Sequence, residues 1–367
     1  MEFGLSESQE FLKDSARKFF AGECPSAEIR RLMETGTSYD AALWSNLTKQ
    51  GYTGIIFPEA YDGVGLGKVE LMLLMEETGR ALLPGPFFST VVLAGSVLEA
   101  VGTAAYKNKY LAPICRGEVR ATVALVEASA SWNPRDVQLS ATNGKLTGEK
   151  LFVTDAAIAD FLVVVARNGV FVVDSKAHGL KISRMHGMDL TRKLYKVEFN
   201  NTPAEHIGGT TDLPRAFDIA AAALAAELVG GMQRILDVTV EYAKTRKQFG
   251  KPIGMFQAVQ HQCADMYLET ESSRSAVYHA GWALEENSPD AAIAVSIAKM
   301  YASDAARTVG NRGIQIHGGM GFTWENDLHL YYRRAKASET AFGDATFHRE
   351  RIARLVIDEG AVSAKHA

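Results

Sequence analysis

Cysteine, excess basic charge and long hydrophobic runs are all scarce in this sequence, and each shortage excludes a class of protein. The three cysteines are odd in number and widely spaced, so they predict neither a disulfide framework nor a metal site (Cys24, Cys115 and Cys263). The formal net charge is -4 and the pI is about 6.2, with acidic and basic residues interspersed. A nucleic-acid partner would need a basic face, so we expect none.

No apolar run approaches ~18 residues, the length that a membrane span requires. The first residues, MEFGLSESQEFLK, contain no basic region followed by an apolar stretch, so we expect no targeting segment. We therefore expect a soluble protein of a reducing compartment, the cytoplasm, without a membrane span. The chain has 367 residues, of which 47% are hydrophobic and 22% are charged. That length and composition suit a large core divided among two or three domains.

The first region, residues 1–116, is predicted to form a helical domain. Ser6 and Gln9 make a capping box, and apolar residues then recur at helical spacing. Further helices are expected at about 40–50 and 68–82.

The middle region, residues 117–208, changes to short segments rich in Val and Phe with a period of two. The segments LTGEKLFVT, DFLVVVARN and GVFVVDS are predicted to be strands. Asn143-Gly144 and Asn168-Gly169 lie between such segments, and Asn-Gly supplies the pair of positive φ angles that a tight hairpin needs. We predict a compact antiparallel, barrel-like β domain.

The last region, residues 209–367, returns to helical periodicity. One helix is expected to end near Lys244, before Gly250 and Pro252, and the next to cover about 255–286. Ser288-Pro289 is predicted to start a third helix that runs to about 311, and a last helix should occupy about 344–358. Long helices with short connections predict a four-helix bundle. The fold class is therefore α+β, in the order helical domain, β domain, helical bundle.

The stretch YAKTRKQFGKPIGMFQ, residues 242–257, has two interpretations. It can be a helix end whose basic residues complement the helix dipole, followed by a turn. It can also bind an anion, because Arg246 is a bidentate donor suited to a pyrophosphate. In that case Phe249 could pack on a flat ring and Gln257 could hydrogen-bond to one.

The stretch QIHGGMGF, residues 315–322, contains three glycines in four positions. An ordinary helix stop needs one glycine, and the others would let a phosphate or a ring approach main-chain N–H groups. A glycine-rich loop alone is a weak signal. Together with the Arg246 stretch, in one helical region, it indicates a nucleotide-binding site.

Several stretches in the same order resemble the acyl-CoA dehydrogenase family over nearly the whole chain. They are WSNLTKQGYTGIIFPEAYDGVGLG and EETGRAL in the first region, GEKLFVT in the second, and RKQFGKPIGMFQ and QIHGGMGF in the third. The resemblance implies the family's fold and an FAD between the β domain and the C-terminal bundle. It also implies that a carboxylate removes the α-proton of an acyl-CoA thioester while a hydride passes from the β-carbon to FAD. An electron-transfer flavoprotein then receives the electrons.

The resemblance also assigns candidate FAD contacts. Thr154 would contact the flavin, or it is a residue chosen for its β propensity; Phe152 would lie beside the ring, or it faces the core as an ordinary strand residue. In the family, the residues that reach across a subunit interface to the adenosine and pyrophosphate of a neighbour's FAD match Arg246, Phe249, Gln315, Gly318 and Gly319. Their retention implies a dimer or a dimer of dimers.

Both positions that the family uses for its catalytic base lack a proton acceptor here. Many members carry a glutamate immediately before the glycine that matches Gly343, where this chain has Phe342. Other members place the glutamate on a bundle helix at the position of Ala220.

The β domain departs from the family pattern as well. A Thr-Glu pair followed by a loop of Gly and Ser is usual, and this chain reads LVEASASWNPRDV. Val126 replaces the threonine hydroxyl, Glu127 remains, and Trp132 lies in the altered loop, either lining the pocket or merely packing. The resemblance therefore leaves this chain's own flavin pocket in question.

Two other carboxylates are candidate bases. Glu227 lies seven residues after Ala220 on the same helix face, within ALAAELVGG, where an unpaired carboxylate would be buried and its pKa raised. It is equally a candidate for a structural ion pair across the bundle. Asp344 could act as base or cap the last helix. His317 and His348 are weaker candidates and are expected to be surface or loop residues.

Groups that would serve a neighbour's FAD are kept, whereas groups that would act in this chain's own site are altered. This pattern resembles the base-lacking subunit of heteromeric bacterial family members, such as those of steroid side-chain breakdown. The main hypothesis is one subunit of a heterotetrameric acyl-CoA dehydrogenase, acting on a steroid or other bulky acyl-CoA with a homologous partner. The alternatives are a self-sufficient homo-oligomer with a relocated base, and a catalytically silent FAD-binding or scaffolding protein.

Overall fold

The computed structural model describes residues 4–359 of the chain. By packing, the chain divides into two compact units. Unit 1 comprises Met1–Ser26, Lys68–Leu83 and Ala221–Ala367, and unit 2 comprises Ala27–Gly67 and Pro84–Ala220. Each unit joins segments that are far apart in sequence, so the three sequence regions proposed above stay a prediction about domains.

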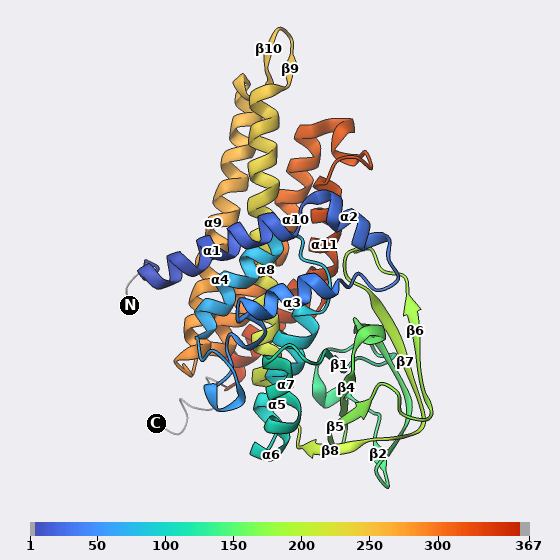
Figure 1. Ribbon diagram of the computed structural model, residues 1–367. Helices are drawn as coiled ribbons and strands as arrows, with labels where there is room; N and C mark the ends of the chain where they lie inside the picture. Colours follow the sequence, from blue (N-terminus) through green and yellow to red (C-terminus); the bar gives the residue numbers. More distant parts are fainter. Residues whose placement is uncertain (1–3, 360–367) are drawn as a thin grey trace. The chain divides into compact units, whose positions relative to one another are not determined.

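Unit 1 is a helical bundle in which long helices lie side by side (Figure 1). Its α-helices are α1 (Glu7–Glu23), α4 (Lys68–Arg80), α8 (Leu213–Thr245, from Ala221 on), α9 (Gln257–Glu285), α10 (Ala291–His317), α11 (Leu328–Thr340) and α12 (Ala345–Ala353). Its short elements are β9 (Lys247–Gln248), β10 (Lys251–Pro252), the 3-10 turns η7 (Ile253–Met255) and η8 (Gly318–Phe322), and the π-helix η9 (Arg354–Glu359).

Helices α4 and α8 cross with their backbones in contact, because both carry glycine at the crossing. A Cβ on Gly79 would lie 1.9 Å from the Glu227 carbonyl oxygen, and a Cβ on Gly230 would lie 1.7 Å from that of Glu76. No side chain fits at either position, so any substitution would separate the helices. The motif EETGRAL thus has a packing role in the bundle.

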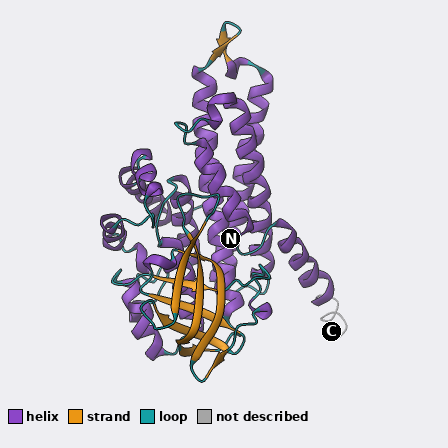
Figure 2. Ribbon diagram, turned by 90° about the vertical axis from the view of Figure 1, so that its right-hand side faces the viewer, coloured by secondary structure: helices purple, strands orange, loops and turns teal. Residues whose placement is uncertain are grey.

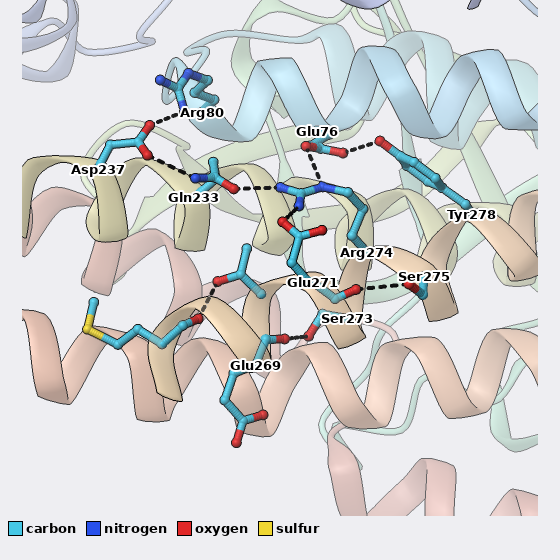
Figure 3. A network of polar contacts seen from close by, with 12 residues as sticks. Glu76, Arg80, Gln233, Asp237, Glu269, Glu271, Ser273, Arg274, Ser275 and Tyr278 are labelled. Carbon is cyan, nitrogen blue, oxygen red and sulfur yellow. Dashed lines mark hydrogen bonds and ion pairs between the residues drawn. The ribbon is translucent and has the colours of Figure 1, made fainter. Parts of the chain in front are cut away.

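The carboxylate of Glu76 on α4 is buried and is hydrogen-bonded to side chains of two other helices, α1 and α9; Figure 3 shows its contacts with α9. It accepts hydrogen bonds from Lys13 Nζ at 3.0 Å, Arg274 Nε at 3.1 Å and Tyr278 Oη at 2.6 Å. Burial raises the pKa of Glu76, but the Arg274 and Lys13 charges outweigh it, so the pKa is lowered overall. The network stabilises the packing of α1, α4 and α9 in unit 1.

Helix α8 is the apolar centre of the bundle. It contains an 18-residue window with a mean hydropathy of 1.4, of which 83% is buried. Length and composition alone would allow this window to cross a membrane, contrary to the sequence expectation. Its burial is that of a core helix in a folded bundle.

Unit 2 contains the remaining helices and all eight strands of the β domain. Its helices are α2 (Ser26–Glu34), α3 (Ala41–Lys49), α5 (Ser96–Val101), α6 (Ala104–Tyr106) and α7 (Ala112–Cys115), with π-helices η3 (Phe87–Gly95) and η4 (Lys107–Leu111) and 3-10 turns η1 (Tyr52–Gly54), η2 (Glu59–Tyr61), η5 (Pro134–Asp136) and η6 (Ala156–Ile158). Its strands are β1 (Ala121–Ala124), β2 (Ala141–Thr142), β3 (Lys145–Thr154), β4 (Phe161–Ala166), β5 (Gly169–Asp174), β6 (Leu180–Met185), β7 (Leu194–Pro203) and β8 (Glu205–Gly208).

The strands form two four-stranded sheets, ordered β1-β4-β5-β8 and β2-β3-β7-β6. Figure 2 shows them gathered in one barrel-like body, as the sequence predicted. One pair, β1 with β4, is parallel, so the sheet is not wholly antiparallel.

The two Asn-Gly pairs behave differently. Asn143 and Gly144 have φ angles of 50° and 70°, as a tight hairpin requires. In the second hairpin Ala166 pairs with Gly169, so the turn residues are Arg167 and Asn168. The Asn168 amide instead bonds to the Ala141 backbone, which fixes the turn without an Asn-Gly pair at its tip.

Most predicted helices are present, with two differences in the bundle. Ser6 and Gln9 form the capping box of α1, as predicted. Helix α10 begins at Ala291 after Asp290 and runs on to His317, so it starts and ends later than expected. After α8 the chain forms the β9–β10 hairpin instead of a plain turn, with Phe249 and Gly250 at positive φ.

Candidate functional site

The β9–β10 hairpin projects beyond the ends of α8 and α9 in unit 1 (Figure 1). Arg246 directly follows α8, at the start of the hairpin. The Arg246 N–H donates to the Tyr242 carbonyl at 2.8 Å, and the Arg246 carbonyl accepts from the Ile253 N–H at 2.8 Å. The backbone at Arg246 is therefore fixed. Its side chain is exposed and makes no ion pair or hydrogen bond within residues 4–359. A fixed backbone with an uncommitted guanidinium suits an external anion.

Two further candidates on this end of unit 1 are also uncommitted. Phe249, at the hairpin tip, is 92% exposed with φ at 53° and touches Phe256 only edge-on. Gln257 opens α9 with its side chain exposed. A fully exposed phenylalanine in a left-handed conformation costs stability in the isolated chain, which indicates a partner surface or a ligand at this tip.

The glycine-rich loop η8 gives a different reason for each of its three glycines. Gly318 ends α10 with φ at +60° and ψ at -140°, a conformation that favours glycine but differs from the left-handed one of an ordinary helix stop. Gly321 is buried, and a Cβ there would lie 3.0 Å from the Ile314 carbonyl oxygen. Gly319 has no positive φ, and a Cβ would meet nothing within 4 Å. Neither folding nor packing within the described residues requires glycine at 319, so its bare backbone suits something outside the chain. Gln315 is also exposed, on the last turn of α10.

In unit 2, the end of β3 carries the candidates for the flavin ring. A β-bulge between Lys150 and Val153 gives Phe152 a φ of 55° and leaves it 39% exposed. Phe152 therefore does not face the core as an ordinary strand residue would. Thr154 is half-buried, and its carbonyl accepts a hydrogen bond from Thr122 Oγ1 at 2.6 Å. The bulge leaves an aromatic side chain partly exposed at the end of the strand.

The altered loop after β1 is closed by Glu127. Its carboxylate accepts from the backbone N–H groups of Gln138 and Leu139 and from Lys150 Nζ at 2.7 Å. Partial burial raises the pKa of Glu127, but these three donors together lower it. Val126, buried and without a hydroxyl, offers no side-chain hydrogen bond to a flavin. Trp132 lies in the closed loop, half-buried.

The two positions where family members carry the base hold apolar, buried side chains. Phe342 is 6% exposed with φ at 57°, and Ala220 is fully buried in α8. Neither can accept a proton.

Glu227 is both buried and paired. Its carboxylate accepts from Arg334 Nη1 at 2.8 Å and from Ser338 Oγ at 3.0 Å. Arg334 also donates to the Leu83 carbonyl. The ion-pair alternative from the sequence is therefore present, with both carboxylate oxygens engaged. A cavity of only about 10 Å³ adjoins the pair, too small for a substrate.

Asp344 caps α12, since its carboxylate accepts from Phe347 N–H at 2.8 Å. Two buried side chains hydrogen-bond to backbone carbonyls of the turn between α11 and α12, which precedes Asp344. Lys299 Nζ donates to the carbonyls of Glu339 and Gly343, each at 2.9 Å, and His348 Nε2 donates to that of Phe342 at 3.1 Å. Burial lowers the pKa of Lys299 to about 7 and that of His348 to about 3.

The sequence did not indicate Lys299 or Arg334, and it predicted that His317 and His348 are surface or loop residues, whereas both are buried and lie in α10 and α12. Lys299 left a signal: it is a lone charge on the apolar face of the segment AAIAVSIAKMYAS. Such a charge must find acceptors inside the protein. No group of three or more His, Cys, Asp or Glu within the described residues could hold a metal ion.

Family models match both helical regions of the sequence. The acyl-CoA dehydrogenase C-terminal domain matches residues 208–357, and the acyl-CoA dehydrogenase N-terminal domain matches residues 6–118. Acyl-CoA dehydrogenase IpdE2 of Mycobacterium tuberculosis is 32% identical, over 90% of this chain and 92% of its own length.

Solved structures share the fold over nearly their whole length. A Tcur3481-Tcur3483 steroid ACAD variant has a TM-score of 0.88 at 31% identity, covering 97% of this chain and 99% of its own. The ChsE4-ChsE5 complex from Mycobacterium tuberculosis has a TM-score of 0.88 at 28% identity, covering 96% and 98%. An FAD complex of PigA has a TM-score of 0.87 at 25% identity, covering 97% and 99%.

These similarities confirm the fold, the FAD cofactor and the enzyme class predicted from the sequence. With two matching family models and a relative above 30% identity across nine-tenths of its length, the chain belongs to the acyl-CoA dehydrogenase family, FAD-dependent oxidoreductases that act on the CH–CH bond of acyl-CoA thioesters.

Proposed function

We propose that this chain is the subunit of a heteromeric acyl-CoA dehydrogenase that helps to hold FAD but does not supply the base. The proposal depends on one observation: each of the four candidate base positions either lacks a proton acceptor or carries a carboxylate that is already hydrogen-bonded. Phe342 and Ala220 have no proton acceptor, and the carboxylates of Glu227 and Asp344 are engaged in an ion pair and a helix cap.

The residues proposed to contact FAD support the same proposal, because they are not engaged in the way that the base candidates are. Arg246, Phe249 and Gly319 have no task within the described residues of the chain. They suit the diphosphate end of an FAD that lies against a neighbouring subunit. Gln315 and Gln257 would add polar contacts in unit 1, whereas Thr154 and Phe152 in unit 2 are candidates for contact with the flavin ring in this chain's own pocket.

The chemistry then divides between two unlike chains. When bound, FAD accepts the hydride that leaves the β-carbon of the acyl group. Removal of the α-proton needs a desolvated carboxylate, which the homologous partner would supply. This chain would fix the diphosphate and leave proton transfer to the partner.

The similarity to the ChsE4-ChsE5 complex and to a steroid ACAD supports an unlike partner and a steroid or other bulky acyl-CoA as substrate. An electron-transfer flavoprotein is the proposed electron acceptor, and the cytoplasm the proposed location. A relative that is a subunit of a caffeyl-CoA reductase-Etf complex supports such an acceptor.

The test is to purify the chain alone and together with a homologous subunit that carries a glutamate at the position of Phe342 or Ala220. We expect little bound flavin in the chain alone. The co-purified pair should be yellow, should bleach when a steroid acyl-CoA is added without oxygen or another electron acceptor, and should reduce an artificial electron acceptor when one is supplied. Bleaching by the chain alone would instead support a self-sufficient homo-oligomer, and flavin without turnover in any pair would support a silent binding protein.

A further inference from the structure

The two elements that would grip the diphosphate are about 70 residues apart in sequence but are joined by one pair of side chains. Tyr242 lies on the last turns of α8, and His317 is the last residue of α10. Their rings are stacked, with centroids 4.3 Å apart and planes inclined by 21°. Tyr242 Oη donates to the His317 carbonyl at 3.5 Å. Both contacts lie within unit 1.

Tyr242 is connected to the hairpin through its backbone. Its carbonyl accepts the Arg246 N–H at 2.8 Å and so closes the turn that presents Arg246. The same residue therefore fixes Arg246 through its main chain and contacts His317 through its ring.

His317 is connected to the glycine-rich loop in a similar way. It directly precedes Gly318, and a Cβ on Gly321 would lie 3.1 Å from the His317 Cβ, so the loop folds back over it. Its Nδ1–H donates to the Gly313 carbonyl at 2.8 Å, because a carbonyl can only accept. The ring cannot rotate without losing that bond and the stack.

His317 is suited to positioning and not to charge. It is 6% exposed, and burial lowers the pKa of its imidazole. A neutral ring adds no attraction for a diphosphate, so its contribution is to the geometry of the loop.

We propose that Tyr242 and His317 form a positioning pair that sets the separation of Arg246 from the amides of Gly318 and Gly319, so that both elements grip one anionic ligand. The proposal rests on the proposed function, in which that ligand is the diphosphate of FAD. Neither side chain is assigned a contact with the cofactor. A pre-set separation removes the need to order two segments on binding.

The test measures FAD affinity by titration of the apo complex, meaning this chain with its co-purified partner, and uses ADP as a competitor. Arg246→Ala removes a charge-assisted contact and is expected to weaken FAD binding roughly tenfold to a hundredfold. Tyr242→Leu removes the stack and is expected to weaken it about tenfold. Tyr242→Phe keeps the stack and should weaken binding by no more than about threefold.

Two controls separate positioning from general damage. Tyr301→Leu makes the same change at another half-buried tyrosine, about 24 Å along α10 from His317, and should leave FAD affinity unchanged. The double variant Tyr242→Leu/Arg246→Ala should lose less FAD affinity than the two single losses added together, since part of the effect of Tyr242 is exerted through Arg246. A merely structural role would give additive losses that follow the melting temperature.

A second measurement needs neither FAD nor the partner. In the chain alone, Tyr242→Leu should speed hydrogen exchange of the amides of Gly318–Gly321 about tenfold, and Tyr301→Leu should not. If Tyr242→Leu does not fold, His317→Ala removes the same stack from the other side.

The outcomes distinguish the two proposals. If Arg246→Ala weakens FAD binding while Tyr242→Leu changes neither affinity nor exchange, the positioning pair is wrong and the proposed function stands. If Arg246→Ala has no effect on FAD binding but Tyr242→Leu speeds exchange, the pair exists and the assignment of the site to FAD fails.

Discussion

Two regions of unit 1 treat their polar groups in opposite ways. At the hairpin and loop η8, Arg246 and the backbone at Gly319 have nothing in the described chain to bind. Around α11 and the following turn, Glu227 pairs with Arg334, and Lys299 donates hydrogen bonds to two backbone carbonyls. The first region is open to a ligand and the second is closed on itself. The region that resembles a catalytic centre by sequence position is therefore the one with least chemistry left to do.

The difference shows that a buried charged residue does not indicate catalysis when its hydrogen-bonding partners lie within the same unit. Glu227 and Lys299 are both buried, which is often the mark of a functional group. Each has its hydrogen-bonding capacity met by residues of the same unit, so each can be explained by packing. Open and closed regions should respond differently to substitution, in stability or in binding.

The largest effect is expected at Glu227. Glu227→Gln leaves Arg334 buried without its counter-charge and should destabilise the chain by about 3–5 kcal/mol, measured by denaturant unfolding. Arg246→Ala, the matched change in the open region, should stay within about 0.5 kcal/mol. If Glu227→Gln kept full stability but abolished flavin reduction in the assembled enzyme, Glu227 would be the base and the comparison would fail.

A smaller effect, dependent on pH, is expected at Lys299. Its pKa is lowered to about 7 by burial, so above that pH the unfolded chain binds more protons than the folded one. The stability of the wild type should therefore rise relative to Lys299→Met, by about 2 kcal/mol between pH 7 and pH 9. Unfolding titrations of both proteins across this range measure the difference.

The same Lys299→Met variant should loosen the turn that Lys299 supports. Amide exchange at residues 340–347 should accelerate while that of the bundle core does not. Unchanged exchange in the turn would mean that His348 and the Asp344 cap hold it without Lys299.

The sequence carries clearer local signals for the open region than for the closed one, for a physical reason. Arg246 and the three glycines are local signals, because each stands in a short motif around a helix end. The partner of Glu227 is 107 residues away, and the acceptors of Lys299 are backbone carbonyls, which carry no residue type. No periodicity could have shown either contact.

The fold predictions were confirmed where the sequence pattern is repeated or local. They were wrong or missing where the pattern is short or joins distant segments. Helical periodicity and the Asn143-Gly144 pair are repeated or local, and both were confirmed. The β9–β10 hairpin pairs only two residues on each side, too few to show a period of two. The parallel pairing of β1 with β4 joins segments 40 residues apart, which composition does not reveal.

Asp344 should give an effect of about 1 kcal/mol. Asp344→Ala removes the cap of α12 and should lower stability by that amount, and Asp344→Asn, which can still accept from Phe347 N–H, should lower it less. Thermal unfolding measures both. Activity of the assembled enzyme should be unchanged by Asp344→Asn, and its loss would identify Asp344 as the base.

The smallest effect on stability, and the sharpest contrast, is expected within the glycine-rich loop. Gly319→Ala adds a methyl group that meets nothing within 4 Å and has an ordinary φ, so stability should change by less than about 0.5 kcal/mol. Gly321→Ala, its neighbour in the same loop, puts a methyl group 3.0 Å from the Ile314 carbonyl oxygen and should be the more destabilising of the two. In FAD titrations of the assembled enzyme, Gly319→Ala should bind FAD more weakly than the wild type, although its stability is unchanged. Equal FAD affinity in Gly319→Ala and wild type would mean that the bare backbone at 319 serves no ligand, and the open region would lose its clearest mark.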